Sequence, residues 1–157
     1  MSKKPVIVAI LAAFAVAVIG GFMSEIGPWY EGLTKPVLNP PNWVFGPAWT
    51  IIYALAVLAA VTGWRATKTN RDRAWLISLF FVNAVLNILW SALFFTMRRP
   101  DWAFAEVITL WLSVLALVVF LGRLSKTAGA AMVVYLLWVT FAAYLNFGII
   151  QLNGPFG

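Results

Sequence analysis

The sequence contains no cysteine and no histidine. Their absence excludes disulfide bonds, nucleophilic catalysis by either residue, and the zinc and haem sites that depend on them. Charged side chains are scarce as well, at 10% of 157 residues against roughly 25% in a soluble domain. The glycine-rich phosphate-binding motifs of nucleotide-driven pumps are also missing. We therefore expect no metal site and no resident cofactor.

Hydrophobic residues make up 63% of the chain, and the mean hydropathy is +0.92. Crossing the hydrocarbon core of a membrane takes about 20 apolar residues in a helix. Five stretches meet this requirement, and together they predict one all-α integral membrane domain over residues 1–157, a bundle of five transmembrane helices. The expected helices cover residues 5–23, 43–63, 74–97, 102–121 and 128–150.

The first stretch follows Lys3 and Lys4 and could be taken for a signal peptide. It is too long for one, and no cleavage site of small residues follows it, so we interpret it as the first span. With five spans, eight basic residues fall on the N-terminal side: Lys3, Lys4, Arg65, Lys68, Arg71, Arg73, Arg123 and Lys126. Three fall on the other side: Lys35, Arg98 and Arg99. This asymmetry predicts a cytoplasmic N-terminus and an external C-terminus, in a bacterial-type inner membrane. Because the basic residues follow the membrane topology, we expect no nucleic-acid partner.

The longest connection, residues 24–42, contains Pro28, Pro36, Pro40 and Pro41, so it cannot form one continuous helix. It also carries Trp29 and other apolar side chains that do not suit a solvent loop. Two interpretations remain open for this segment. It is either a lid-like loop over the mouth of the bundle or a strap whose aromatic rings lie at the level of the lipid headgroups.

Tryptophan residues occur at two depths in the expected spans. Trp43, Trp64, Trp75 and Trp102 lie at helix ends, where indole rings usually form interfacial belts. A second set lies roughly 9 to 18 Å below the outer helix ends, too deep for such a belt. At that depth each indole N–H requires a hydrogen-bond partner. The deep set comprises Trp49, Trp90, Trp111 and Trp138.

Polar side chains share helix faces with these rings. Asn83, Asn87 and Ser91 recur at four-residue intervals, and Trp138, Ala142 and Asn146 do the same in the last span. Amides are costly in contact with lipid, so these faces are expected to point into the bundle. They either bond neighbouring helices to one another or line a ligand cavity with walls of aromatic rings.

Two further features of the spans leave alternatives open. Ala9, Ala13, Ala17 and Gly21 form a stripe of small residues on the first helix, which suits close packing within the bundle or a homodimer face. Glu106 lies about one turn inside the fourth span. Its negative charge either interacts favourably with the positive end of the helix dipole or has a functional role in the protein.

Four motifs carry a resemblance to a known family. They are Trp29-Tyr30-x-x-Leu33-x-Lys35-Pro36, Pro40-Pro41-x-Trp43-x-Phe45-x-Pro47-x-Trp49-x-x-x-Tyr53, Leu86-Asn87-x-x-Trp90-Ser91-x-Leu93-Phe94-Phe95, and Leu137-Trp138-x-x-Phe141-Ala142-x-x-Leu145-Asn146. They run from the first loop to the fifth span and resemble the translocator protein family. This family is also called the tryptophan-rich sensory protein or peripheral-type benzodiazepine receptor family.

The resemblance implies a five-helix bundle whose first loop closes over a pocket, with a homodimer as the assembled form. It implies binding of porphyrins, benzodiazepine-type or isoquinoline carboxamide drugs, and sterols. The family's sterol pattern requires a basic residue after its aromatic on the last helix, and none follows Tyr144 here. The implied ligand-binding residues are Trp49, Tyr53, Asn87, Trp90, Trp138, Ala142 and Asn146, covered by Trp29, Tyr30 and Lys35.

The leading hypothesis is thus a membrane receptor or carrier for a flat hydrophobic ligand, chiefly an iron-free porphyrin whose propionate pairs with Lys35. The porphyrin would be a ligand and not a cofactor. Two alternatives remain: a porphyrin-degrading enzyme, for which no titratable pair stands out in the sequence, and a scaffold or sensor acting through protein partners. Membrane lipid surrounds the protein in every case.

Overall fold

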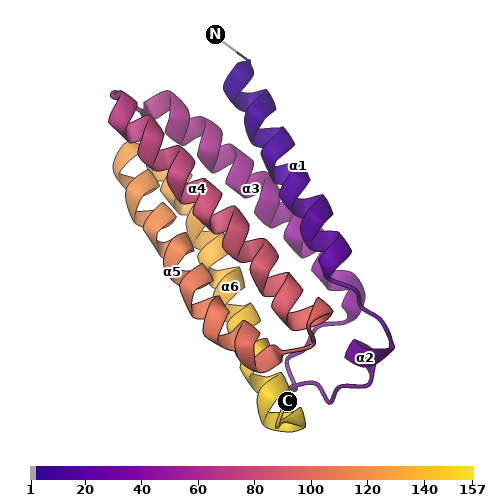
Figure 1. Cartoon of the computed structure of the whole chain (residues 1–157). Coiled ribbons are helices and arrows are strands. Elements are labelled where there is room, and N and C mark those ends of the chain that lie inside the picture. Colours follow the sequence, from indigo (N-terminus) through magenta and orange to yellow (C-terminus); the bar gives the residue numbers. More distant parts are fainter. Residues whose placement is uncertain (1–2) are drawn as a thin grey trace.

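The structure is a computed structural model that describes residues 3–157. Its long helices are α1 (Lys4–Met23), α3 (Phe45–Ala66), α4 (Asn70–Ser91), α5 (Pro100–Leu124) and α6 (Lys126–Asn153). A single turn, α2 (Pro28–Glu31), and the 3-10 turn η1 (Asn42–Val44) precede α3, and α4 ends in the π-helical turn η2 (Ala92–Thr96). Among the described residues, five helices are long and apolar enough to cross a membrane, so the predicted all-α bundle is confirmed (Figure 1).

Local signals in the sequence account for the helix ends. Proline occupies the first turn of α1, α2 and α5, where its missing N–H is not needed. Before α4, the hydroxyl of Thr69 accepts from the backbone N–H of Asp72, whose carboxylate accepts in return from the backbone N–H of Thr69, both at 3.1 Å. Ser125 separates α5 from α6 and caps the start of α6.

The core of the bundle lies along α5 and α6, which pack as an antiparallel hairpin. Leu110, Leu117, Leu121 and Met132 are fully buried there. Close to the turn, a Cβ added at Gly129 would lie 2.7 Å from the Cα of Gly122, so the two helix backbones approach one another as closely as glycine allows.

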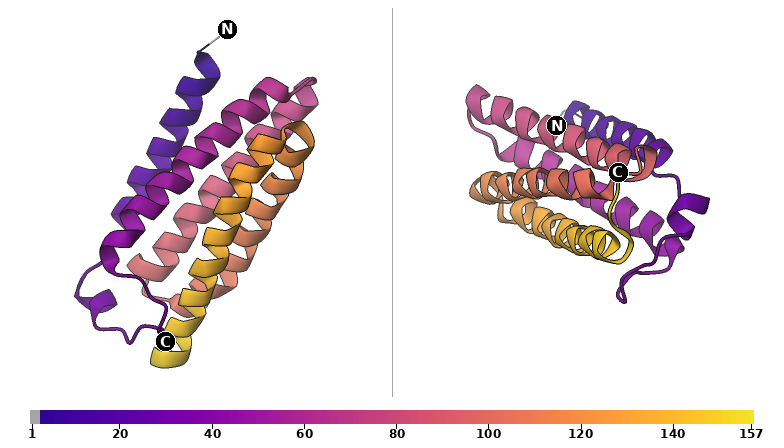
Figure 2. Two further views of the ribbon diagram at one scale, coloured as in Figure 1. Left: turned by 180° about the vertical axis from the view of Figure 1, so that it is seen from behind. Right: turned by 60° about the horizontal axis from the view of Figure 1, so that its bottom comes forward.

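The first helix lies at the edge of the bundle against α3 and α4, and its N-terminal end leans away from them (Figures 1 and 2). Gly20 is its only buried residue among those described. Ala9, Ala13 and Ala17 are half-buried and face the bundle interior, which leaves the outward face of α1 to the membrane. A homodimer stays a prediction, and this stripe would not form its interface.

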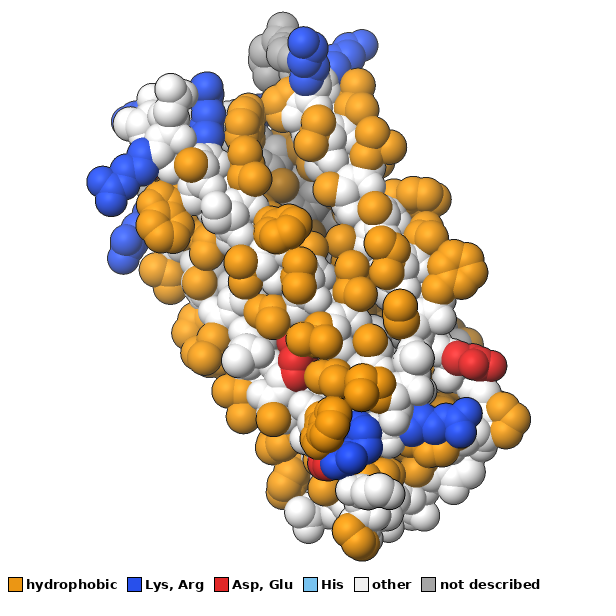
Figure 3. Space-filling model, in the orientation of Figure 1, with side chains coloured by type: hydrophobic (Ala, Val, Ile, Leu, Met, Phe, Trp, Pro, Cys, Tyr) orange, Lys and Arg blue, Asp and Glu red, His pale blue; other side chains and the backbone are white. Residues whose placement is uncertain are grey.

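The two ends of the bundle differ. The N-terminus lies at one end, whereas the C-terminus and the first loop (residues 24–41) lie together at the other (Figures 1 and 2). Lysine and arginine side chains gather at the two ends, and a band of hydrophobic side chains separates them (Figure 3). The first loop is therefore placed over one mouth of the bundle.

Candidate ligand-binding cavity

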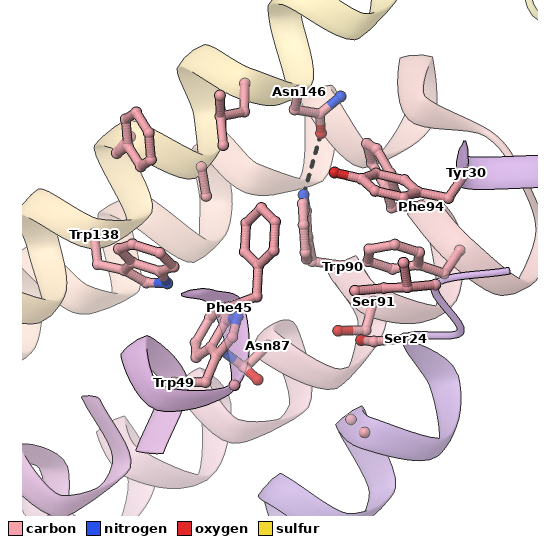
Figure 4. Close-up of a pocket in the computed structure, with 18 of the residues that line it drawn as sticks. Ser24, Tyr30, Phe45, Trp49, Asn87, Trp90, Ser91, Phe94, Trp138 and Asn146 are labelled. Atoms are coloured by element: carbon pink, nitrogen blue, oxygen red, sulfur yellow. Dashed lines mark hydrogen bonds between the residues drawn. The ribbon is translucent and has the colours of Figure 1, made fainter. Parts of the chain in front are cut away.

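A cavity of about 360 Å³ opens beneath the first loop, between α1, α3, α4 and α6. We call it the lid-side cavity. Eight of the ten residues expected at the site line it, and Figure 4 shows several of them converging from three helices. These eight are Tyr30, Trp49, Tyr53, Asn87, Trp90, Trp138, Ala142 and Asn146. Their roles in binding a ligand stay predictions.

Aromatic rings form two walls of the lid-side cavity. On the α3 side, Trp49 stacks on Tyr53 with ring centroids 5.6 Å apart and meets Trp138 edge-on at 6.1 Å. On the α4 side, Trp90 stacks on Phe94 at 5.3 Å. Residues four apart lie on one helix face, so each stacked pair follows from its own helix. Rings held in such contacts present fixed flat surfaces.

The polar side chains of the cavity are largely engaged with one another. Tyr53 donates to Oδ1 of Asn87 at 3.0 Å, and Nδ2 of Asn87 donates to the phenol oxygen of Tyr135 at 2.9 Å. Trp90 Nε1 donates to Oδ1 of Asn146 at 3.2 Å, as the dashed line in Figure 4 marks. Nδ2 of Asn146 donates in turn to the carbonyl of Pro100 at 2.8 Å. The amides therefore bond helices together and also form part of the cavity wall.

Trp138 is the exception. Its Nε1 is buried and has no hydrogen-bond partner among the described residues, and Figure 4 shows the nitrogen edge of its indole turned toward Phe45 and the cavity interior. A buried N–H without an acceptor costs about 1–3 kcal/mol, so an acceptor atom that reached this position would relieve an unfavourable state. Glu106 is the other buried group without a partner in the described part of the chain, and it does not line the cavity.

The first loop is attached to the end of α6. The backbone N–H of Thr34 donates to Oδ1 of Asn153, and Nδ2 of Asn153 donates to the carbonyl of Thr34, both at 2.8 Å. Pro36 packs against Gly148, where a Cβ would lie 2.8 Å from the proline ring. Tyr30 is buried beneath the loop, and this burial raises the pKa of its phenol above the usual value. The loop thus covers the cavity and is held by contacts with α6.

Two of the ten expected residues do not line the cavity. Trp29 packs edge-on against Phe94 with ring centroids 6.0 Å apart. Lys35 directs its ammonium to three backbone carbonyls of the loop, those of Tyr30 at 2.7 Å, Leu33 at 3.1 Å and Glu31 at 3.3 Å. Its expected contact with a propionate stays a prediction, and a ligand would compete there with these carbonyls.

Other lining residues were absent from the expected site. Phe94 and Phe95 line the cavity next to Trp90. Both belong to the third family motif, and this was the signal in the sequence that could have placed them at the site. Phe45 and Phe141 also line the cavity. Tyr135 is buried behind the cavity wall, and its phenol oxygen accepts from Asn87. In the sequence, the only signal for this position was that it lies three residues before Trp138. Of the four deep tryptophans, Trp111 does not line the cavity. Its Nε1 donates instead to the hydroxyl of Thr140, at 2.8 Å.

Fold and cavity together define the class of this protein: an integral membrane bundle of five helices with an aromatic cavity beneath its first loop. Residues 8–152 match the model of the TspO/MBR family, and the chain belongs to that family. It is 37% identical over 155 residues to the tryptophan-rich protein TspO of Archaeoglobus fulgidus, covering 98% of this chain and 99% of that protein.

Further relatives carry the names expected from the motifs. The tryptophan-rich sensory protein of Cereibacter sphaeroides is 36% identical over 143 residues, which cover 91% of this chain and 88% of that protein. The human translocator protein is 29% identical over 120 residues, covering 76% of this chain and 71% of its own length. The resemblance seen in the motifs is thus confirmed.

Proposed function

We propose that this protein is a membrane receptor or carrier that binds a flat hydrophobic ligand, chiefly a porphyrin, in the lid-side cavity. The observation that carries the proposal is the pairing of two aromatic walls with one buried indole N–H that lacks a partner. Ligand sites are mostly apolar and contain a few polar groups that fix orientation. Here the rings would stack on the faces of the ligand, and Trp138 would bond an acceptor atom.

The size of the cavity bears on how a porphyrin would enter. Small-molecule sites measure about 300–1,000 Å³, and a cavity of about 360 Å³ is at the low end of that range. A macrocycle with two propionate arms would fill it and push against the first loop. Because the loop is held to α6 chiefly by Asn153 and by packing on Gly148, outward movement of the loop would make room. Smaller flat drugs of the benzodiazepine type would fit without such movement.

The residues of the cavity also favour binding over acid–base chemistry. Tyr30 and Tyr53 are the titratable side chains among the described residues that line it. Neither is a ready proton donor or acceptor at neutral pH. With no histidine or cysteine in the chain, the cavity suits an iron-free porphyrin better than a ligated haem. Stable absorbance of the bound porphyrin under illumination is expected of a receptor, whereas its loss would indicate a degrading enzyme.

A titration of the purified protein with an iron-free dicarboxylic porphyrin tests the proposal, with quenching of tryptophan fluorescence as the signal. We expect saturable binding of one porphyrin per chain. Ala142→Leu would place extra atoms in the cavity and should weaken binding at least tenfold. Ala130→Leu is the matched control, because Ala130 is exposed on the same helix and away from the cavity. Equal binding by the two variants would place the porphyrin elsewhere.

We also propose that the protein lies in an inner membrane with the N-terminus in the cytoplasm. The eight basic residues on the N-terminal side, against three on the other, support this orientation. The first loop and the lid-side cavity would then open toward the outside of the cell.

A further inference from the structure

A second hollow, which we call the N-terminal groove, lies between α1 and the pair of helices α3 and α4. It measures about 470 Å³ and occupies the half of the bundle nearest the N-terminus. Its α1 face runs from Lys4 to Val16 and consists mostly of alanine and valine, whereas Trp64 and Phe80 line the opposite face. The surface is visibly hollowed between α1 and α4 (Figure 3). The space exists because the small side chains of α1 leave it unfilled.

The groove has the length and width of a lipid tail. Val16 lies twelve positions after Lys4, which is about 18 Å along a helix. One leaflet of a hydrocarbon core of about 30 Å is about 15 Å deep. A volume of about 470 Å³ spread over about 18 Å describes a long and narrow space, whereas a helix with its side chains is about 10–12 Å across. An extended acyl chain fits such a channel, and a helix from a second copy does not.

The deep end of the groove offers nothing to a polar ligand. Asn83, Asn87 and Tyr53 lie there. Asn83 donates to Ser113 at 2.9 Å, and Asn87 is bonded to both Tyr53 and Tyr135. The buried groups without a partner in the described chain are on Trp138 and Glu106, neither of which lines the groove. A terminal methyl group would therefore meet no unsatisfied donor or acceptor.

The mouth of the groove is basic. Lys4 lines it from α1, and the guanidinium of Arg73 lies over the ring of Trp64, 5.3 Å from the ring centroid. Both positions are at the N-terminal end of the bundle, at the level of lipid headgroups. A negatively charged headgroup is attracted to such positions.

From this combination we infer that the N-terminal groove holds one acyl chain of an anionic phospholipid, from the leaflet on the side of the N-terminus. The chain fills the space between α1 and the rest of the bundle, and the headgroup contacts Lys4 and Arg73. The bound lipid completes the packing of α1. This inference does not depend on which ligand occupies the lid-side cavity.

Native mass spectrometry of the purified protein tests the inference, by titration with phosphatidylglycerol and with phosphatidylcholine that carry the same palmitoyl and oleoyl chains. We expect one phospholipid per chain and tighter binding of phosphatidylglycerol, by about fivefold for each of the two charges. The double variant Lys4→Gln/Arg73→Gln should bind both lipids alike and keep the affinity of the parent protein for phosphatidylcholine. Equal affinity for the two lipids in the parent protein would overturn the role of the basic mouth.

A pair of alanine variants tests the groove itself. Ala9→Phe fills the groove and should abolish the bound lipid, whereas Ala15→Phe is exposed on the same helix outside the groove and should retain it. An unchanged helical circular dichroism signal in both variants serves as the check that the bundle is folded. Lipid retention by Ala9→Phe, or a dimer in place of the protein–lipid complex, would overturn the inference.

Discussion

Tyr53 on α3 donates a hydrogen bond of 3.0 Å to Oδ1 of Asn87 on α4, and this pair belongs to the wall of both hollows in the bundle. Asn87 extends the interaction to Tyr135 on α6. Three helices are thus joined at the point where the lid-side cavity and the N-terminal groove meet.

Removing the hydroxyl of Tyr53 should lower the stability of the bundle. In Tyr53→Phe, the ring remains but the buried Oδ1 of Asn87 loses its donor, which costs about 1–3 kcal/mol. We expect a lower midpoint of thermal unfolding, measured by circular dichroism in one detergent. Tyr144→Phe is the control, because Tyr144 is 44% exposed. Equal midpoints for the two variants would mean that the hydrogen bond contributes nothing.

Tryptophans of the cavity and tryptophans at the membrane surface should differ in their effect on ligand binding. Trp49→Phe and Trp138→Phe should each weaken porphyrin binding by about 1 kcal/mol, the scale of an aromatic contact. Trp43→Phe and Trp75→Phe should leave it unchanged, since these rings are 74% and 53% exposed. Fluorescence titration of the four variants measures the affinities. A comparable loss in the exposed pair would contradict the proposed site.

The orientation of the bundle can be measured with reporter fusions. A reporter that is active only in the cytoplasm should give a signal at the N-terminus and none at the C-terminus, because basic residues favour the cytoplasmic side. The reverse pattern would overturn the orientation and would place the first loop in the cytoplasm. Signals from both termini would contradict the odd number of spans.

The first loop should control how long a ligand stays bound. Pro40 and Pro41 restrict the conformations of the free loop, so their replacement by alanine should raise the entropy lost on closure. We expect faster porphyrin dissociation from Pro40→Ala/Pro41→Ala, by stopped-flow fluorescence, with the helical circular dichroism signal unchanged. An unchanged dissociation rate would mean that the loop is only an interfacial strap.

Lys35 provides the companion measurement for this loop. In Lys35→Ala, loss of the three hydrogen bonds to carbonyls should loosen the loop. The dissociation rates of a porphyrin dicarboxylate and of its dimethyl ester should then rise by the same factor. A pairing of the ammonium with a propionate would instead affect the dicarboxylate alone. The ratio of the two dissociation rates therefore separates the two roles.

The glycines between α5 and α6 should differ in their tolerance of a methyl group. In Gly129→Ala, the new Cβ would lie 2.7 Å from the Cα of Gly122, and such overpacking costs about 1–3 kcal/mol. A Cβ at Gly122 would meet nothing within 4 Å, so Gly122→Ala should retain or slightly raise stability through helix propensity. Thermal unfolding compares the two. A Gly129→Ala midpoint equal to that of the parent protein would show that the hairpin adjusts freely.

The sequence predicted the five spans well because membrane insertion depends on length and hydropathy, which a single chain displays directly. The depth of each tryptophan below its helix end can be read from the sequence in the same way. Trp49, Trp90 and Trp138 are too deep for an interfacial belt, and all three line the lid-side cavity.

Depth does not fix the direction in which a side chain points around its helix. Trp111 is as deep as the others, yet it bonds Thr140 away from the cavity. Trp64 lies at a helix end like a belt residue, but it is half-buried and lines the N-terminal groove. Both outcomes depend on the rotation of α3 and α5 in the bundle, which the packing of all the helices determines.

Two other features required the tertiary structure. The bonds of Lys35 arise from the path of the first loop, because its ammonium lies where three carbonyls converge. The small residues of α1 indicated close contact with another helix, and α1 does pack against α3 and α4, but these residues also line the two hollows. Small side chains are equally suited to a tight contact and to an open space, so the pattern alone does not distinguish them.

The attachment of Thr34 to Asn153 has a practical consequence for the handling of this protein. An affinity tag or fluorescent domain fused to the C-terminus is joined to the helix end that holds the first loop in place. Drag or crowding from the fused domain would then act on the cover of the cavity. Rates of ligand release should be recorded after proteolytic removal of such a fusion, and a tag at the N-terminus, at the opposite end of the bundle, avoids the difficulty (Figure 1).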